Sequence, residues 1–121
     1  HFIYEPDHII ILDPTLIEST QVDSGLKENG WIIMNTDKAP KTFGRFSRFR
    51  VATVDANRIA LEHKLGSATA PIVNTAMLGA FSKITRMVSV DSVVEAMAEF
   101  VPVNKAGNAA AIKEAYEKTT A

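Results

Sequence analysis

The sequence predicts an α/β fold built on a small parallel β-sheet, and three observations support this fold class. Three short runs, residues 8–12, 31–35 and 50–55, have the apolar character of strands that are buried on both faces of a sheet. A helix signal lies between the first two runs, as expected for a crossover between parallel strands. From residue 56 onward the pattern is helical, so helices are available to cover the sheet.

The first half of the chain supplies the strands. The run "HIIIL" is β-branched throughout and ends at Asp13-Pro14, which predicts a strand followed by a turn. Residues 21–29 predict a short helix that stops at Gly30. "WIIMN" then predicts the second strand and "RVATVD" the third.

The second half supplies the helices. Asp55 follows the third strand and predicts an N-cap for the next helix, which ends at Gly66 and turns Ile59 and Ala60 inward. Ser89 predicts the cap of a helix over residues 90–100, and residues 109–119 predict the last helix. The inward positions of the helix after Ser89 are Val90, Val93, Val94 and Met97.

The stretch "PIVNTAMLGAF" predicts a helix from Pro71 to Ile84, because proline suits the first helical turn. One face of this helix is apolar: Val73, Met77, Ala80 and Ile84, broadened by Ile72, Ala76 and Phe81.

Thr75 and Gly79 lie four residues apart and form a strip with little side-chain bulk. A helical glycine costs roughly 0.5–1 kcal/mol relative to alanine, so Gly79 predicts close packing against another helix or the sheet. Asn74 and Thr75 fit either local capping or contact with a neighbouring subunit. We therefore predict an interface at Asn74, Thr75 and Gly79.

Composition excludes several classes of partner and site. The 121 residues fit a single domain, 1–121, and 14 acidic against 13 basic residues favour neither nucleic acid nor an anionic membrane. There is no cysteine, so this chain holds no disulfide, zinc-thiolate site or cysteine-ligated iron–sulfur cluster. Apolar stretches fall well short of the roughly 20 residues that span a bilayer, and residues 1–8 lack a signal-peptide layout. A soluble protein is expected.

The predicted sheet is small for its apolar character. The chain enters its first strand at His8, with no predicted strand or helix before it. Strands that are apolar on both faces need neighbours and cover on both sides. The missing strands belong either to a second chain or to a preceding segment of a larger domain, and we favour the preceding segment.

Five segments in order resemble the gamma subunit of 2-oxoacid:ferredoxin oxidoreductases: "YEPDHIIILDPTLIE", "VATVDANRIALE", "PIVNTAMLGAF", "VSVDSVVEAM" and "NKAGNAAAIKEAYEK". The resemblance covers nearly the whole chain. It implies a Rossmann-like three-layer α/β/α sandwich with a mostly parallel sheet. The glycine-rich G-x-GGQG opening of that family is absent here. We therefore expect the C-terminal part of a gamma domain that lacks its N-terminal portion.

The resemblance also implies a reaction. A 2-oxoacid, most commonly pyruvate, is decarboxylated on thiamine diphosphate, electrons pass through iron–sulfur clusters to ferredoxin, and coenzyme A receives the acyl group. Thiamine diphosphate and Mg²⁺ are implied to lie in the alpha and beta partners, and a ferredoxin-like delta subunit completes the complex. The resemblance implies an anaerobic cytoplasm, no catalytic residue and no cofactor bound by this chain alone, and a role in assembly or in the approach of coenzyme A.

The most basic stretch is "KAPKTFGRFSRFR", which carries five cations and no acid among three phenylalanines. One interpretation is a solvated loop whose phenylalanines pack inward. The functional alternative is binding of a phosphorylated cofactor, an acidic protein such as ferredoxin, or single-stranded nucleic acid. Within the resemblance, the coenzyme A phosphates or ferredoxin docking fit best, at Lys41, Arg45 and Arg48.

Other polar residues favour structural roles. Asp13 and Asp55 end strands at the edge where parallel sheets bind ligands, yet a turn and an N-cap explain them better. The spacing of His1, His8 and His63 indicates no metal site. The pair Glu95 and Glu99 fits an exposed helix face.

Three hypotheses follow from the sequence. The first is a non-catalytic part of a 2-oxoacid:ferredoxin oxidoreductase complex, which we favour. The second is a freestanding α/β module that binds a phosphate-bearing ligand. The third is a purely structural assembly domain.

Overall fold

Four strands form a single sheet in the order β1-β2-β3-β4. The structure is a computed structural model that describes residues 2–4, 8–13, 30–44, 49–67, 72–101 and 104–121. Strands β2 (His8–Ile11), β3 (Trp31–Asn35) and β4 (Arg50–Val54) pair in parallel. Ile9, Ile32 and Val51 lie opposite one another in this register. The predicted α/β class and mostly parallel sheet are confirmed.

Strand β1 (Phe2–Tyr4) precedes β2 and pairs with it antiparallel. The expectation that no element precedes His8 is therefore wrong. Three residues are too few to show a period-2 pattern, so this strand has no detectable signal in the sequence.

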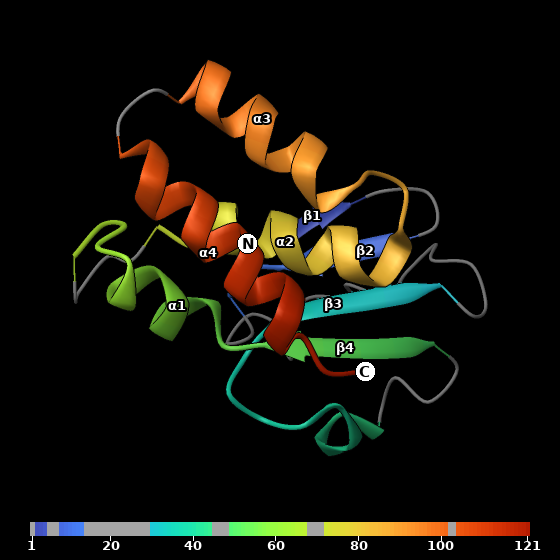
Figure 1. The fold of residues 1–121 in the computed structure, drawn as a ribbon. Coiled ribbons are helices and arrows are strands. Elements are labelled where there is room, and N and C mark those ends of the chain that lie inside the picture. The colour runs from blue at the N-terminus through green and yellow to red at the C-terminus, as the bar shows by residue number, and fades with distance from the viewer. Residues whose placement is uncertain (1, 5–7, 14–29, 45–48, 68–71, 102–103) are drawn as a thin grey trace.

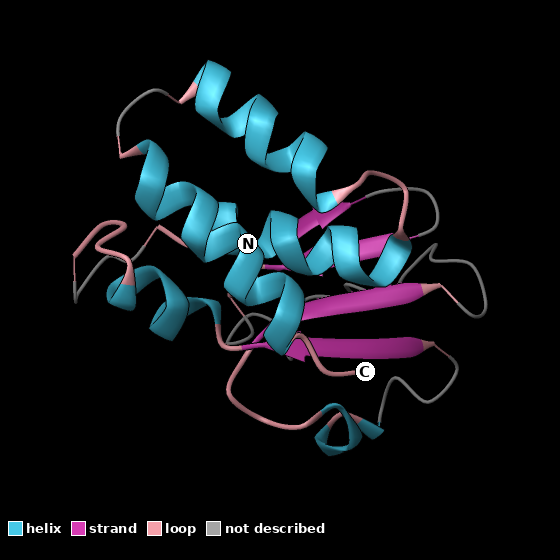
Figure 2. Ribbon diagram, in the orientation of Figure 1, coloured by secondary structure: helices cyan, strands magenta, loops and turns pink. Residues whose placement is uncertain are grey.

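Four α-helices lie together on one side of the strands, whereas the short 3-10 helix η2 (Pro40–Thr42) stands apart, below β4 (Figures 1 and 2). The helices are α1 (Ala56–Glu62), α2 (Asn74–Thr85), α3 (Val90–Phe100) and α4 (Lys105–Lys118). The predicted helix over residues 21–29 lies outside the described residues. Within the described ranges, no helix has the length and apolar character needed to cross a bilayer.

Alternation along the strands divides the core between the two faces of the sheet. Ile10, Ile33 and Ala52 face α1, α2 and α4, and the predicted inward residues Ile59 and Ala60 join this cluster. The second face carries its own buried set: Ile9, Ile11, Ile32, Met34 and Phe49, with Phe43 and Val51 packed against them. The inward packing of Phe43 and Phe49 agrees with the loop interpretation of the basic stretch.

Two helix starts follow the capping chemistry that the sequence predicts, whereas α1 ends at Glu62, before the predicted stop at Gly66. Asp55 accepts a hydrogen bond from the Arg58 amide at 3.1 Å, and Ser89 accepts one from the Ser92 amide at 3.1 Å. Both predicted N-caps are confirmed. Helix α4 begins earlier than predicted because Asn104, in the left-handed region at φ 56°, accepts a hydrogen bond from the Gly107 amide at 3.2 Å.

Most of the residues predicted to lie on the inward face of α2 are buried or pack against the core, but one is not. Met77 and Ala80 are buried, and Val73 and Ile84 pack against the same core. Ile72 is 54% exposed because it precedes the first turn of the helix, so its predicted place on the apolar face is wrong.

Candidate functional site

Helix α4 is the element that packs closely against Gly79 of α2. A Cβ at Gly79 would overlap the carbonyl oxygen of Ile112 and lie 3.2 Å from the Ala115 Cβ. Thr75 is also buried there, and its hydroxyl donates a hydrogen bond to Asn108 Oδ1 at 3.2 Å. The predicted close helix packing at Gly79 is confirmed, with α4 as the partner.

This finding corrects the interface prediction for two of its three residues. Thr75 and Gly79 are buried against α4 of the same chain, so neither is available to a neighbouring subunit. The sequence shows that α2 needs a close partner but not which element supplies it. Asn74 is exposed in the first turn of α2, and its contact with another subunit stays a prediction.

The carboxyl edge of the sheet, where β2, β3 and β4 end, is organised by the buried side chain of Asn35. Its Nδ2 donates to the Leu12 carbonyl at 3.0 Å and to Asn57 Oδ1 at 3.1 Å. Its Oδ1 accepts from the Ala56 amide at 2.9 Å. One amide thus joins the ends of β2 and β3 to the first turn of α1.

A cleft of about 390 Å³ opens at this edge between β3, β4 and the end of α4. Its walls come from the turn 36–39, the strand end 53–55, Arg58 on α1, and the C-terminal Lys118 and Thr120. In open parallel sheets, ligands bind outside the carboxyl ends of the strands. The cleft is therefore the candidate functional site of the chain.

The C-terminal residues complete this cleft because they pair with β4. Thr120 exchanges two backbone hydrogen bonds with Thr53, at 2.8 and 2.9 Å. Thr119 caps the end of α4 through a 2.6 Å hydrogen bond to the Ala115 carbonyl. This pairing holds Lys118 and Thr120 at the cleft.

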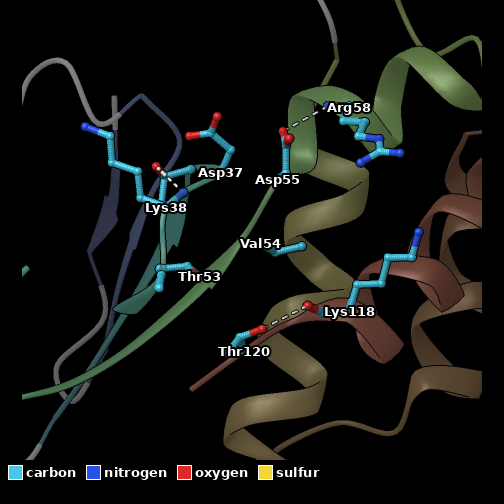
Figure 3. A pocket seen from close by; sticks show the side chains of 10 residues that line it. Asp37, Lys38, Thr53, Val54, Asp55, Arg58, Lys118 and Thr120 are labelled. Carbon is cyan, nitrogen blue, oxygen red and sulfur yellow. Dashed lines mark hydrogen bonds between the residues drawn. The ribbon is translucent and has the colours of Figure 1, made fainter. Parts of the chain in front are cut away.

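Three cations and two acids line the cleft. Figure 3 shows Asp37 and Lys38 on one side and Arg58 and Lys118 on the other, with Asp55 near Arg58. Asp55 is engaged as the cap of α1. Cations around a polar cleft suit an anionic ligand such as a phosphate or carboxylate.

Both cations on the α1 and α4 side are held by carboxylates outside the cleft. Arg58 Nε lies 3.0 Å from Glu62 Oε1, and Lys118 Nζ lies 3.0 Å from Glu114 Oε2. An arginine has five N–H donors, so the bond to Glu62 leaves further donors on the same guanidinium. Both contacts are ion pairs at the surface, and each cation keeps further N–H donors for a ligand.

Of the three basic residues Lys41, Arg45 and Arg48 that the sequence predicts as a binding site, the structure describes only Lys41. It is exposed on η2, two residues beyond Ala39, which lines the cleft. Arg45 and Arg48 lie outside the described residues. Arg50, at the end of the same stretch, stacks on the ring of Trp31 at 4.7 Å.

The remaining predicted residues have varied environments. Asp13 is exposed at the end of β2, and Glu95 and Glu99 are exposed on α3, as the exposed-face interpretation predicts. His8 meets the ring of Phe81 edge-on with centroids 6.2 Å apart, and His1 lies outside the described residues. His63 lies 2.8 Å from Glu114 on α4, a contact that sequence spacing could not show.

Comparison with known proteins settles the family. The family model described as pyruvate ferredoxin/flavodoxin oxidoreductase matches residues 2–118. The chain belongs to this family. It is 45% identical over 97% of its length to the pyruvate/ketoisovalerate oxidoreductases common subunit gamma of Pyrococcus abyssi. It is 43% identical over 96% of its length to the pyruvate synthase subunit PorC of Methanothermobacter marburgensis. The resemblance inferred from the sequence is confirmed.

The fold of this pyruvate ferredoxin/flavodoxin oxidoreductase family member is also similar to a solved structure. The crystal structure of pyruvate oxidoreductase subunit PORC from Thermotoga maritima superposes with a TM-score of 0.80 at 28% identity, over 98% of this chain and 66% of that one. The chain spans 63% and 62% of the lengths of the two relatives named above.

Sequence reasoning missed Asn35 and the cleft cations Arg58 and Lys118, whereas the third cation, Lys38, belongs to the basic stretch that the sequence singles out. A signal for Asn35 exists, because it is the polar residue that ends the otherwise apolar second strand. Arg58 and Lys118 had no comparable signal, since each is an ordinary charged residue on a helix. The antiparallel pairing of Thr53 with Thr120 brings the end of α4 to the cleft beside α1.

Proposed function

We propose that this chain is part of the gamma component of a pyruvate or other 2-oxoacid:ferredoxin oxidoreductase complex. In that complex, thiamine diphosphate and Mg²⁺ would lie in alpha and beta partners, and iron–sulfur clusters would carry electrons to ferredoxin. The match of the family over residues 2–118 carries this proposal. An anaerobic cytoplasm is the compartment that fits such a complex.

The role proposed for the chain itself is assembly and the approach of coenzyme A, not catalysis. The sequence has no cysteine with which to ligate a cluster. The features that support a coenzyme A role are cationic: the cleft with Lys38, Arg58 and Lys118, and Lys41 on the adjoining η2. Arg45 and Arg48 follow in the sequence and are proposed to contribute to binding the phosphates or docking ferredoxin.

The first test is purification of the complex through an affinity tag on this chain. Co-purification of a thiamine-binding and a cysteine-rich polypeptide, with oxidation of pyruvate or another 2-oxoacid that depends on coenzyme A, supports the proposal. A chain that purifies alone and restores no such activity contradicts it.

The second test concerns coenzyme A. Replacing Lys41, Arg45 and Arg48 by alanine in the intact complex should raise the apparent KM for coenzyme A or for ferredoxin, because charge-assisted bonds to phosphate or to acidic side chains are lost. The matched control is Lys113→Ala, an exposed lysine on α4. Unchanged KM values for both substrates remove these three residues from the proposal.

A second candidate function rests on the cleft alone. A freestanding module for a phosphate-bearing ligand would bind inorganic pyrophosphate without any partner, and Arg58→Ala would weaken that binding. Tight binding by the purified chain in titration calorimetry favours this candidate. The absence of binding by the purified chain removes it.

A further inference from the structure

A second polar cluster joins the C-terminal end of α1 to α4. Glu62, His63 and Glu114 bring their ligating atoms within 4.8 Å of one another. His63 Nε2 lies 2.8 Å from Glu114 Oε1, and the two side chains are only 23% and 19% exposed. The cluster therefore contains one imidazole nitrogen and two carboxylates at the boundary of the core.

Backbone geometry at the end of α1 positions the first two residues of the cluster. His63 ends the helix, with its amide bonded to the Ile59 carbonyl, and Lys64 adopts a left-handed conformation at φ 58°. Asn104 Nδ2 lies 3.5 Å from the His63 carbonyl oxygen. The turn after α1 therefore contacts α4 at two points: at Asn104, which precedes the helix, and at Glu114, near its C-terminal end.

Each of these two carboxylates also has one oxygen paired with a cation. Arg58 Nε donates to Glu62 Oε1 at 3.0 Å, and Lys118 Nζ donates to Glu114 Oε2 at 3.0 Å. Carboxylates that ligate metals are oriented by such outer hydrogen bonds. Because Lys118 engages Oε2, the other oxygen of Glu114 remains directed at His63.

The electrostatics of Glu114 favour its ionised form. The hydrogen bond with His63 is the largest cause that lowers the pKa of Glu114, and Lys118 and Glu62 lower it further, while burial opposes them.

We propose that Glu62, His63 and Glu114 bind one Zn²⁺ ion that fastens α1 to α4. Zinc accepts mixed nitrogen and oxygen ligands, and three protein ligands leave one position for water. Ligand bonds of about 2.0–2.2 Å place two ligand atoms of a tetrahedral zinc roughly 3.3–3.6 Å apart. The donor atoms of the cluster, all within 4.8 Å of one another, need only small side-chain shifts to reach that spacing.

The test is calorimetric titration of the full chain with Zn²⁺ in chelator-stripped buffer at pH 7.5. The unsubstituted chain should bind one Zn²⁺, and His63→Gln and Glu114→Gln should each weaken binding by at least about tenfold. Glu117→Gln, which removes an exposed carboxylate three residues further along α4, should bind as the unsubstituted chain does. Mg²⁺, which disfavours imidazole, should not compete.

Two results overturn the proposal: no Zn²⁺ binding by the unsubstituted chain, or equal binding by His63→Gln and Glu114→Gln. Circular dichroism checks that the variants fold. If they do not fold, Co²⁺ is titrated into the unsubstituted chain, and the visible absorption bands of a tetrahedral site with nitrogen and oxygen ligands are the expected result. Their absence also overturns the proposal.

Discussion

The α2–α4 interface and the carboxyl edge of the sheet are built on opposite principles. At the α2–α4 interface, Gly79 lets α4 approach closely, and a buried hydrogen bond joins Thr75 to Asn108. At the carboxyl edge, Asn35 makes three hydrogen bonds and charged side chains surround an open cleft. The α2–α4 interface requires that Gly79 has no side chain, whereas the carboxyl edge requires the hydrogen bonds of the Asn35 side chain.

The difference suggests a division of roles between the two regions. A closely packed helix pair tolerates almost no added volume, so its effect falls on stability. A cleft at strand ends keeps its charged groups at the surface, where each pair adds little to stability and remains available to a ligand. Substitutions that separate stability from ligand binding test this division.

The largest effect is expected at the α2–α4 interface, from Gly79→Ala. The new Cβ would overlap the Ile112 carbonyl, which belongs to helix backbone and cannot move aside alone. We expect a loss of about 2–3 kcal/mol in the free energy of unfolding, measured by urea denaturation. Alanine is otherwise the better helix former, so packing alone accounts for the loss.

Gly44→Ala is the matched control for this substitution, because a Cβ there meets nothing within 4 Å. Its free energy of unfolding should stay within about 0.5 kcal/mol of the unsubstituted value. Equal stability of the Gly79 and Gly44 variants would show that the two helices can separate at no cost.

The next effect is expected at the carboxyl edge, from Asn35→Ala. The substitution leaves the Leu12 carbonyl and the Ala56 amide without the buried partner that each has now. An unsatisfied buried group costs about 1–3 kcal/mol, so we expect a loss of about 2 kcal/mol in the same measurement. Asn57→Ala, which removes only the exposed partner of Asn35, should cost clearly less. An Asn35 variant no less stable than the Asn57 variant would show that Asn35 does not hold the edge together.

The smallest effect is expected in the pH dependence of stability at Glu114. Folding lowers the pKa of this carboxyl, mainly through its hydrogen bond with His63. The ionised carboxylate therefore stabilises the fold above the pKa of the unfolded chain, about 4.3, and this stabilisation is lost as the pH falls through the pKa of the folded chain. In the presence of EDTA at pH 7, the free energy of unfolding of the unsubstituted chain should exceed that of Glu114→Gln by up to about 1 kcal/mol. That difference should vanish in strong acid. A constant difference from pH 7 to pH 2 would show that its origin is not electrostatic.

The sequence predicts features that depend on neighbouring residues, and it does not predict features that depend on residues far apart in the chain. Regular elements and caps are encoded locally, so "WIIMN", Asp55 and Ser89 behave as predicted. The strip of small side chains at Thr75 and Gly79 on α2 is also a local feature. It predicted close packing correctly, but it did not predict that α4 is the packing partner. The cleft and the contact of His63 with Glu114 join residues from distant parts of the chain, and no local pattern describes them. The three-residue strand β1 was missed because a strand this short has no period to detect.

The pairing of Thr120 with Thr53 has a consequence for how ligand binding and folding are coupled. The walls of the cleft come from opposite halves of the chain, so the cleft forms only after the long segment between Thr53 and Thr120 has closed into a loop. A ligand that bridges Lys38 and Lys118 therefore recognises only the completely folded chain. Such a ligand would slow global unfolding and leave the fraying of α2 and α3, which do not line the cleft, unchanged, a signature that hydrogen exchange can resolve residue by residue.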